Sequence, residues 1–272
     1  MRHEVRGAVV TGGGSGLGAA FARALAGRGI PVVLADLDGA RAEAVAGEVR
    51  ALGVDAWGLE VDVRDARAME ALRDVAIGKL PALDLWINNA GVAVAGAVGE
   101  VPLDDWRWVL DVNLMGVIHG CHAVVPHLRA QGRGVVLNVS SAAGLLATPE
   151  MAPYNVAKAG VVSLSETLYG ELSPLGLGVT VLCPTFFRTN LLDAARSASP
   201  RALRIAGRLM DRSSFTPDDV AEAALRDALA GRLFSVPMSD GRWLWRLRRL
   251  LPQGFYDGYR HGVGLVRRLA SR

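Results

Sequence analysis

The chain has 272 residues, of which 51% are apolar and 21% are charged. This composition excludes an intrinsically disordered chain, and the length suits one large α/β domain or two small ones. The formal net charge of +3 gives the whole chain no polyanion-binding character, and the two cysteines, Cys121 and Cys183, predict neither a disulfide framework nor a metal site.

Short apolar, β-rich runs alternate with helix-length segments from the first residues onward. Because the runs are nearly continuous in apolar residues, we expect buried parallel strands at 8–11, 31–36, 56–61, 83–88, 135–140 and 179–183. Helices are expected between them at 17–29, 39–52, 65–79, 103–131 and 152–175. This alternation predicts a doubly wound, Rossmann-type α/β fold with about seven parallel strands, helices on both faces and ligand sites at the carboxyl ends of the strands.

The first and last parts of the chain extend this prediction. We expect no signal peptide, because residues 5–11 already have a strand pattern, and no spanning helix, because no apolar run approaches roughly 20 residues. A cytoplasmic protein is therefore the expectation. Thr216 and Pro217 have the pattern of a helix start, and a helix to about residue 230 with a strand near 233–236 would close a domain at 1–237.

A glycine-rich segment, Thr11-Gly12-Gly13-Gly14-Ser15-Gly16-Leu17-Gly18, lies between the first strand and the first helix. Glycines let the backbone turn tightly and approach a pyrophosphate, and the helix N-terminus offers free N–H groups. A flexible turn is the other interpretation of such a string. Its position between strand and helix favours a dinucleotide site.

The second strand ends at Asp36, whose carboxylate is placed to bind the hydroxyls of an adenosine ribose. Alone, Asp36 is equally explained as an N-cap of the next helix. Beside the glycine segment it favours NAD over NADP, because a 2′-phosphate at 4 Å would be repelled by about 4 kcal/mol at an effective dielectric of 20. The one basic residue close in sequence, Arg41, is expected to turn outward.

Tyr154 and Lys158 are spaced i and i+4 at the start of a predicted long helix, so they share one face. A neighbouring ammonium favours the phenolate and is predicted to lower the phenol pKa from near 10 by about three units. An incidental surface pair is the other interpretation. Against it, Lys158 is one of only two lysines in the chain, and the helix follows a strand that ends at Asn138-Val139-Ser140-Ser141.

Several ordered motifs now make a family resemblance specific. From about residue 5 to 236 the chain resembles the short-chain dehydrogenase/reductase family in its Tyr-x-x-x-Lys form. The residues that carry the resemblance are the glycine loop, Asp36, Asp62-Val63, Asn88-Asn89-Ala90-Gly91, Asn113, Ser141, Tyr154 with Lys158, and Pro184 followed by Thr189. It implies an oxidoreductase acting on CH–OH groups, with NAD as cofactor and a homodimer or homotetramer formed through the helices at 103–131 and 152–175.

The resemblance also implies residue roles. Tyr154 would exchange a proton with the substrate oxygen, Ser141 rather than Ser140 would hydrogen-bond that oxygen, Lys158 would bind the nicotinamide ribose, and Asn113 would hold a water in a proton relay. The implied cofactor contacts are Gly12, Ser15, Gly16, Leu17, Gly18, Asp36, Leu37, Asp62, Val63, Asn89, Ala90, Gly91, Tyr154, Lys158, Pro184 and Thr189. Taken singly, Asn113 is equally a satisfied helix amide, and Asp62 a strand-end cap.

One departure concerns the loop after the sixth strand. The family usually has Gly after the proline, whereas this chain has Thr185, which does not adopt positive φ freely. We therefore expect a different loop path, with Thr189 as the least secure cofactor contact. The residues beyond it, 186–212, are predicted to form a substrate lid rich in apolar side chains, which favours a lipophilic alcohol or ketone; simple packing of the lid is the equal alternative.

The extension at 238–272 is basic and amphipathic. With eight arginines and one acid, residues 241–272 carry +7, whereas the remaining 22 basic and 26 acidic residues give −4. We consider packing on the substrate cleft or a partner subunit first, peripheral contact with anionic lipid second, and nucleic acid third for want of a recognisable binding fold. For the whole chain, a non-catalytic NAD-binding sensor is the rival function, which the complete Ser141, Tyr154, Lys158 and Asn113 set disfavours.

Overall fold

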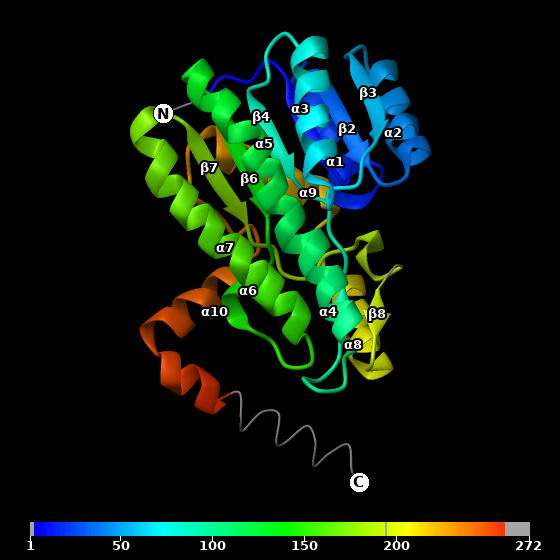
Figure 1. Cartoon of the computed structure of the whole chain (residues 1–272). Coiled ribbons are helices and arrows are strands. Elements are labelled where there is room, and N and C mark those ends of the chain that lie inside the picture. The colour runs from blue at the N-terminus through cyan, green and yellow to red at the C-terminus, as the bar shows by residue number, and fades with distance from the viewer. Residues whose placement is uncertain (1–2, 194, 259–272) are drawn as a thin grey trace.

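The computed structural model describes residues 3–193 and 195–258, and its centre is a seven-stranded parallel sheet (Figure 1). The strand order is β3-β2-β1-β4-β6-β7-β9. The strands are β1 (Ala8–Thr11), β2 (Val32–Asp36), β3 (Ala56–Glu60), β4 (Leu85–Asn88), β6 (Val135–Val139), β7 (Gly178–Leu182) and β9 (Phe234–Ser235). The order reverses beside β1, so the predicted doubly wound, Rossmann-type sheet is confirmed.

Side chains of the strands alternate between two apolar layers, which explains why each strand is apolar on both faces. Val10 and Leu34 pack with α1 (Gly16–Ala26), α2 (Gly39–Ala51) and α9 (Pro217–Leu229). Val9 and Val33 point the other way, toward α3 (Ala66–Lys79), α5 (Gly116–Gln131) and α7 (Ala152–Leu172). Figure 1 shows α3, α5 and α7 in front of the sheet. Both faces are thereby removed from water.

The predicted helix at 103–131 is continuous but not uniform. It consists of α4 (Leu103–Leu110), a π-turn η1 (Asp111–Met115) and α5. By length and composition it is long and apolar enough to cross a membrane, contrary to the expectation from sequence. In the fold its Val117, Val124 and Leu128 are buried against the sheet layer, which is the pattern of a core helix.

Shorter elements gather beyond the carboxyl ends of the strands, at the lower end of Figure 1. They comprise α6 (Ala142–Leu146), η3 (Asn190–Leu192), α8 (Pro200–Asp211), α10 (Ser239–Leu250) and a small parallel sheet of β5 (Val94–Ala95) with β8 (Arg196–Ser197). The segment 186–212, predicted as a lid, is therefore partly helical. The β5–β8 pairing, in contrast, is too short to give a sequence pattern.

Helix ends follow their local chemistry. Thr216 and Asp219 form a capping box at the start of α9, and Pro217 takes the first turn, as the sequence predicts. The helix predicted at 152–175 ends at Leu172, and its last residues form the 3₁₀ turn η2 (Ser173–Leu175) that contains a proline. These ends set where the loops that carry functional side chains begin.

Candidate active site

The glycine loop joins β1 to α1 and forms one wall of a large cavity. Gly12 has φ +63° and Gly16 has φ +51°, values that favour glycine. A Cβ on Gly12 would lie 2.8 Å from the Ala90 Cα, and one on Gly18 would overlap the Gly12 carbonyl oxygen. Gly12, Ser15, Gly16 and Leu17 line the cavity. Gly18 is not among the lining residues, and its close approach to the Gly12 carbonyl supports the shape of the loop.

The loop is held by the ends of two neighbouring strands. The Asn89 side-chain amide donates hydrogen bonds to the carbonyls of Thr11 and Gly12, at 2.9 and 3.0 Å. The Thr11 hydroxyl accepts from the backbone N–H groups of Asn89 and Ala90. Asn89, Ala90 and Gly91 line the cavity, as predicted. Asn89 therefore fixes the loop and borders the site at once.

Asp36 lies at the end of β2 and points to the loop. Its Oδ2 accepts from the Gly14 N–H at 2.9 Å and its Oδ1 from the Asp38 N–H at 3.1 Å. Asp38, and not Asp36, caps α2, which removes the N-cap interpretation of Asp36. Leu37 and Arg41 line the same end of the cavity. The expectation that Arg41 turns away is thus wrong in part, because its guanidinium pairs with Asp38 at 3.1 Å beside the cavity.

The end of β3 brings the next two predicted contacts to this end of the cavity. Asp62 and Val63 line it. The Asp62 carboxylate accepts hydrogen bonds from the Arg64 guanidinium and backbone N–H, and this Arg64 contact lowers the Asp62 pKa. Asp62 therefore also behaves as the strand-end cap that the sequence left open.

Tyr154 and Lys158 lie on the first turns of α7 with both side chains buried, at 7% and 3% exposed. The Lys158 Nζ lies 5.8 Å from the centre of the Tyr154 ring and donates to the Val139 carbonyl at 2.9 Å. Ser141 lies beside them at the start of α6, where its hydroxyl accepts from the Ala143 N–H at 3.1 Å, and it acts to lower the Tyr154 pKa. Ser140 donates to the Lys158 carbonyl at 2.8 Å. Only Ser141 of the two serines therefore faces the phenol.

The protonation of this pair departs from the prediction. Burial raises the pKa of Tyr154 to about 12, and the hydrogen bond with Ser141 offsets this only in part. Burial likewise lowers the pKa of Lys158 from 10.5 to about 8. The predicted drop in the phenol pKa is therefore wrong, because loss of hydration outweighs the effect of an ammonium that lies 5.8 Å from the ring centre.

Asn113 lies fully buried in the π-turn η1. Its amide nitrogen donates to the Val92 carbonyl and its amide oxygen accepts from the Val92 N–H, both at 2.8 Å. A Cβ on Gly91 would lie 3.3 Å from the Asn113 Oδ1 and 3.6 Å from the Lys158 Nζ. The side chain is thus the satisfied amide of the alternative interpretation, and its oxygen lies near Lys158.

The loop after β7 carries the remaining predicted contacts. Pro184 and Thr189 line the cavity, and Thr189 caps the short helix η3. Thr185 is not among the residues with positive φ, so the loop follows a path open to a β-branched residue. Its hydroxyl donates to Asp240 of α10 at 3.3 Å, and a Cβ on Gly241 would lie 2.7 Å from its methyl. Thr185, which stands where the family usually has glycine, thus contacts α10 through both its hydroxyl and its methyl group.

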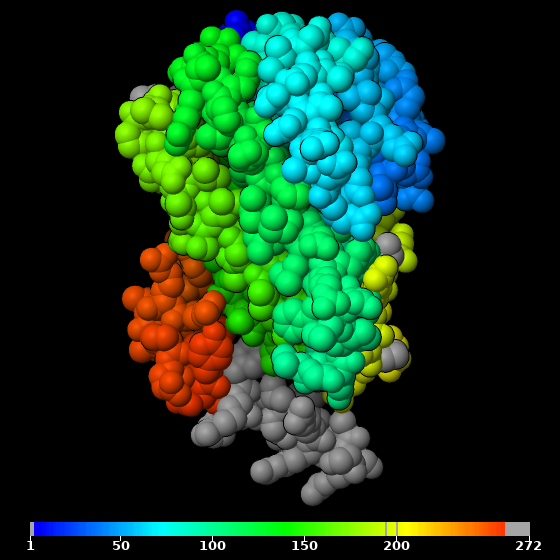
Figure 2. Space-filling model, in the orientation of Figure 1, coloured from blue at the N-terminus to red at the C-terminus, as the bar shows by residue number. Residues whose placement is uncertain are grey.

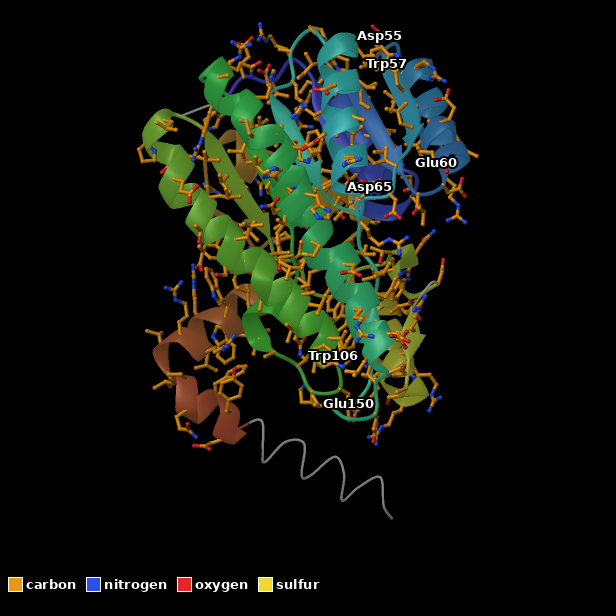
Figure 3. The ribbon with its side chains drawn as sticks, in the orientation of Figure 1. Asp55, Trp57, Glu60, Asp65, Trp106 and Glu150 are labelled. Atoms are coloured by element: carbon orange, nitrogen blue, oxygen red, sulfur yellow. The ribbon has the colours of Figure 1, made fainter. Side chains whose placement is uncertain are left out.

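The cavity has a volume of about 1660 Å³, which exceeds the usual range for a single small ligand. One end is formed by the glycine loop, and the other by the lid and α10. Figure 3 labels Glu150, which lines the cavity at the lower end of the molecule, far from Asp55. The apolar lid-end lining consists of Val92, Trp108, Leu146, Met151, Phe186, Leu191, Leu192, Ile205, Leu209, Met210, Leu244, Leu247 and Phe255.

Sequence reasoning did not select Val92, Trp108, Leu146 or Met151 as site residues. They come from loops and short helices that carry no motif. The C-terminal residues Leu244 and Leu247 had a signal, the apolar side of an amphipathic segment, and their packing on the cleft is among the interpretations given for it. The later residues of that segment, including Tyr259, Val263 and Leu265, lie outside the described residues.

Comparisons with known proteins cover the domain that carries this cavity. Residues 6–200 match the family model for short chain dehydrogenase. The chain is 36% identical over 221 residues to 3beta-hydroxysteroid dehydrogenase 1 of Eggerthella lenta, covering 79% of this chain and 84% of that protein.

Two solved structures resemble the fold over nearly their whole length. A short chain dehydrogenase/reductase from Burkholderia phymatum, in complex with NAD, gives a TM-score of 0.84 at 34% identity, covering 92% of this chain and 94% of that one. A short-chain dehydrogenase from Sphingobium yanoikuyae, in complex with NADPH, gives 0.74 at 26% identity, with coverage of 95% and 94%. These neighbours thus hold either nicotinamide cofactor.

Proposed function

The chain belongs to the short-chain dehydrogenase family of oxidoreductases, and from that premise we propose that it interconverts a lipophilic secondary alcohol and its ketone with NAD(H). The observation that carries the proposal is the convergence of Tyr154, Lys158 and Ser141 with the glycine loop on one cavity. A large cavity with a few convergent polar groups and strongly perturbed pKa values is typical of an active site.

The residues present fit a dinucleotide. Gly12 and Gly16, both with positive φ, and Gly14, which lacks a Cβ, leave the backbone of the loop bare at the cavity wall. The N-terminus of α1 follows the loop. Ser15 makes no capping hydrogen bond to that helix. We assign the pyrophosphate to this loop, the adenosine ribose to Asp36, and the nicotinamide ribose to Lys158. The bound cofactor supplies the hydride for reduction or accepts it in oxidation.

Tyr154 and Ser141 perform the proton chemistry. With a pKa of about 12 the phenol is protonated at neutral pH, so in reduction it donates its proton to the carbonyl oxygen while Ser141 hydrogen-bonds that oxygen. In oxidation the proton moves the other way, from the alcohol hydroxyl to Tyr154, which must first have lost its own proton to act as the phenolate base. Lys158, with a pKa of about 8, keeps its proton at pH 7 and stabilises the phenolate that remains after reduction.

Asn113 acts on this site through its backbone. The Asn113 side-chain amide is bonded to Val92 through both its nitrogen and its oxygen, which favours a main-chain carbonyl as the contact of a water relay toward Lys158. A π-turn shifts the helical hydrogen-bond pattern by one residue and is frequent at functional sites for that reason. We therefore assign the relay contact to the backbone of η1, with the Asn113 side chain holding that turn in place.

A lipophilic substrate is favoured by the apolar lid end of the cavity, whose lining includes Phe186, Leu191, Ile205 and Leu244. The hydroxysteroid dehydrogenase relative is consistent with a large apolar alcohol. The test is a panel in which cofactor reduction is measured with cyclohexanol, a bicyclic alcohol, a 3-hydroxysteroid and glycerol. We expect kcat/KM to rise with apolar size, and a preference for glycerol or sugars would overturn the substrate class.

The rival proposal, a non-catalytic NAD-binding sensor, needs the glycine loop but not the buried phenol and ammonium, so the intact Tyr154 and Lys158 favour an enzyme. We treat residues 1–237 as the catalytic domain, with a lid at 186–212, and residues 238–272 as an extension. Homo-oligomerisation through the helices at 103–131 and 152–175 and a cytoplasmic location stay predictions.

A further inference from the structure

We propose that the outer side of the C-terminal extension docks the protein on an anionic lipid bilayer. The docking surface, called the tail surface below, consists of Arg242, Trp243, Arg246, Arg249, Leu250 and Leu251. Three of these are large apolar residues with high exposure: Trp243 at 63%, Leu250 at 78% and Leu251 at 59%. Figure 2 shows the outer side of α10 (orange) at the molecular surface.

The apolar residues of the tail surface are not needed to hold α10 on the domain. The inner side of the helix already packs, with Leu244 and Leu247 at the cavity and Trp245 against Phe234, whose ring centres lie 4.6 Å apart. The Arg248 guanidinium donates to the Leu145 carbonyl of α6. Trp243 and Leu250 lie seven residues apart, and therefore on one outward side of the helix. Exposed apolar patches on a folded protein mark interaction sites, so we infer that a partner covers this side of the helix.

The positive charge around these apolar residues favours an anionic partner for the tail surface. Within residues 3–193 and 195–258, no ion pair joins an arginine of α10 to a carboxylate. The Arg242 guanidinium donates to the carbonyls of Val236 and Pro237 and keeps its charge. By sequence, residues 241–272 carry +7 while the rest of the chain carries −4. An anionic surface therefore attracts this end of the molecule and repels the remainder.

An anionic bilayer can bury the apolar side chains of the tail surface and also pair with its arginines, whereas a soluble polyanion can only pair with the arginines. Phosphates of a nucleic acid would pair with Arg246 and Arg249 but leave Leu250 and Leu251 in water. Tryptophan, leucine and arginine side by side are the composition of helices that lie in a lipid interface, with the cations at the headgroups. Two copies pairing through this surface would bring their arginines together, which the charge disfavours.

Docking in this way has a consequence for the cavity. The same helix presents Leu244 and Leu247 to the apolar lid end of the cavity and the tail surface to the outside. A bilayer held by the tail surface therefore lies one helix diameter from the space assigned to the substrate. This part rests on the proposed function, whereas the docking itself does not.

The test is co-sedimentation of the full chain with phosphatidylcholine vesicles that contain or lack phosphatidylglycerol, without substrate or cofactor. We expect binding only to the anionic vesicles and a decline with added salt. The pair Arg246→Gln and Arg249→Gln should weaken the partition coefficient by about 25-fold, at about fivefold for each charge. The pair Leu250→Ser and Leu251→Ser should weaken it by roughly tenfold or more.

Matched controls lie elsewhere on the molecule. Leu52→Ser removes a leucine that is 61% exposed, and Arg67→Gln removes an exposed arginine on α3; neither should change vesicle binding. Thermal unfolding of each variant must match that of the wild type.

Three outcomes would overturn the proposal. The first is no binding to anionic vesicles. The second is binding that the leucine pair leaves intact, together with arginine-dependent binding to duplex DNA, which would indicate a general polyanion site. The third is tail-dependent dimerisation in sedimentation velocity without vesicle binding. Because no step measures turnover, failure here is distinct from failure of the proposed enzyme activity.

Discussion

The carboxylate of Asp36 makes a quantitative prediction about cofactor choice. Its Oδ2 is held by the Gly14 N–H at the end of the cavity assigned to the adenosine ribose. A 2′-phosphate placed there would bring like charges together, at about 4 kcal/mol for two unit charges 4 Å apart and a dielectric of 20. Solvent and the neighbouring arginines 41 and 64 reduce this, so we take about 2 kcal/mol, or about thirtyfold in preference for NAD.

The assay compares kcat/KM for NAD and NADP by absorbance at the nicotinamide band, with one alcohol. Asp36→Asn keeps the size of the side chain and an oxygen for the Gly14 N–H but removes the charge, so the preference should fall to a few-fold. Asp38→Asn is the matched control, because Asp38 is a neighbouring carboxylate and asparagine is an equally good helix cap. A wild type that prefers NADP, or a preference that survives Asp36→Asn, would refute this electrostatic reasoning.

Three further predictions concern the loop and the buried pair. Burial lowers the pKa of Lys158 from 10.5 to about 8, so between these pH values the folded state binds fewer protons than the unfolded state and its stability rises with pH. In denaturant unfolding, the wild-type free energy of unfolding should increase by about 3 kcal/mol from pH 8 to 10.5 relative to that of Lys158→Met. The same pH dependence in both proteins would count against a buried ammonium. Gly18→Ala places a Cβ on the Gly12 carbonyl oxygen and should weaken NAD binding at least tenfold in a fluorescence titration. The control Gly170→Ala, at an open helical position, should leave NAD affinity unchanged, and equal affinity of the two variants would contradict the role of Gly18. Without added NAD, the Tyr154 phenol should ionise near pH 12, and at a lower pH when NAD is added, as measured by the ultraviolet difference between the wild type and Tyr154→Phe. Ionisation near pH 7 without NAD would show that burial does not dominate the Tyr154 pKa.

The sequence predicts the sheet and the glycine loop well because their signals are local. A parallel strand buried on both faces has a nearly unbroken apolar run, and all seven predicted strands lie within a residue or two of the observed ones. The i and i+4 spacing likewise places Tyr154 and Lys158 together on α7. The short strands β5 and β8 lack such a signal, because two residues cannot show a period.

The parts that the sequence did not predict depend on packing between distant segments. The direction of the pKa shift of Tyr154 depends on how completely α6, α7 and the lid exclude water from the phenol. The spacing of residues along the sequence does not indicate this. The pairing of Arg41 with Asp38 beside the cavity is likewise a tertiary result. The docking of α10 on Thr185 joins residues 55 apart, and so the reason for a threonine in place of glycine becomes visible only in the fold.

The central claim is that the buried phenol of Tyr154 exchanges the proton with the substrate oxygen. Its most direct test is Tyr154→Phe, with kcat for alcohol oxidation measured beside NAD affinity by fluorescence titration. The account predicts a loss of kcat of at least about 100-fold with cofactor affinity within a few-fold of the wild type, because the ring and its packing remain. Turnover by the phenylalanine variant at near wild-type rate would contradict it.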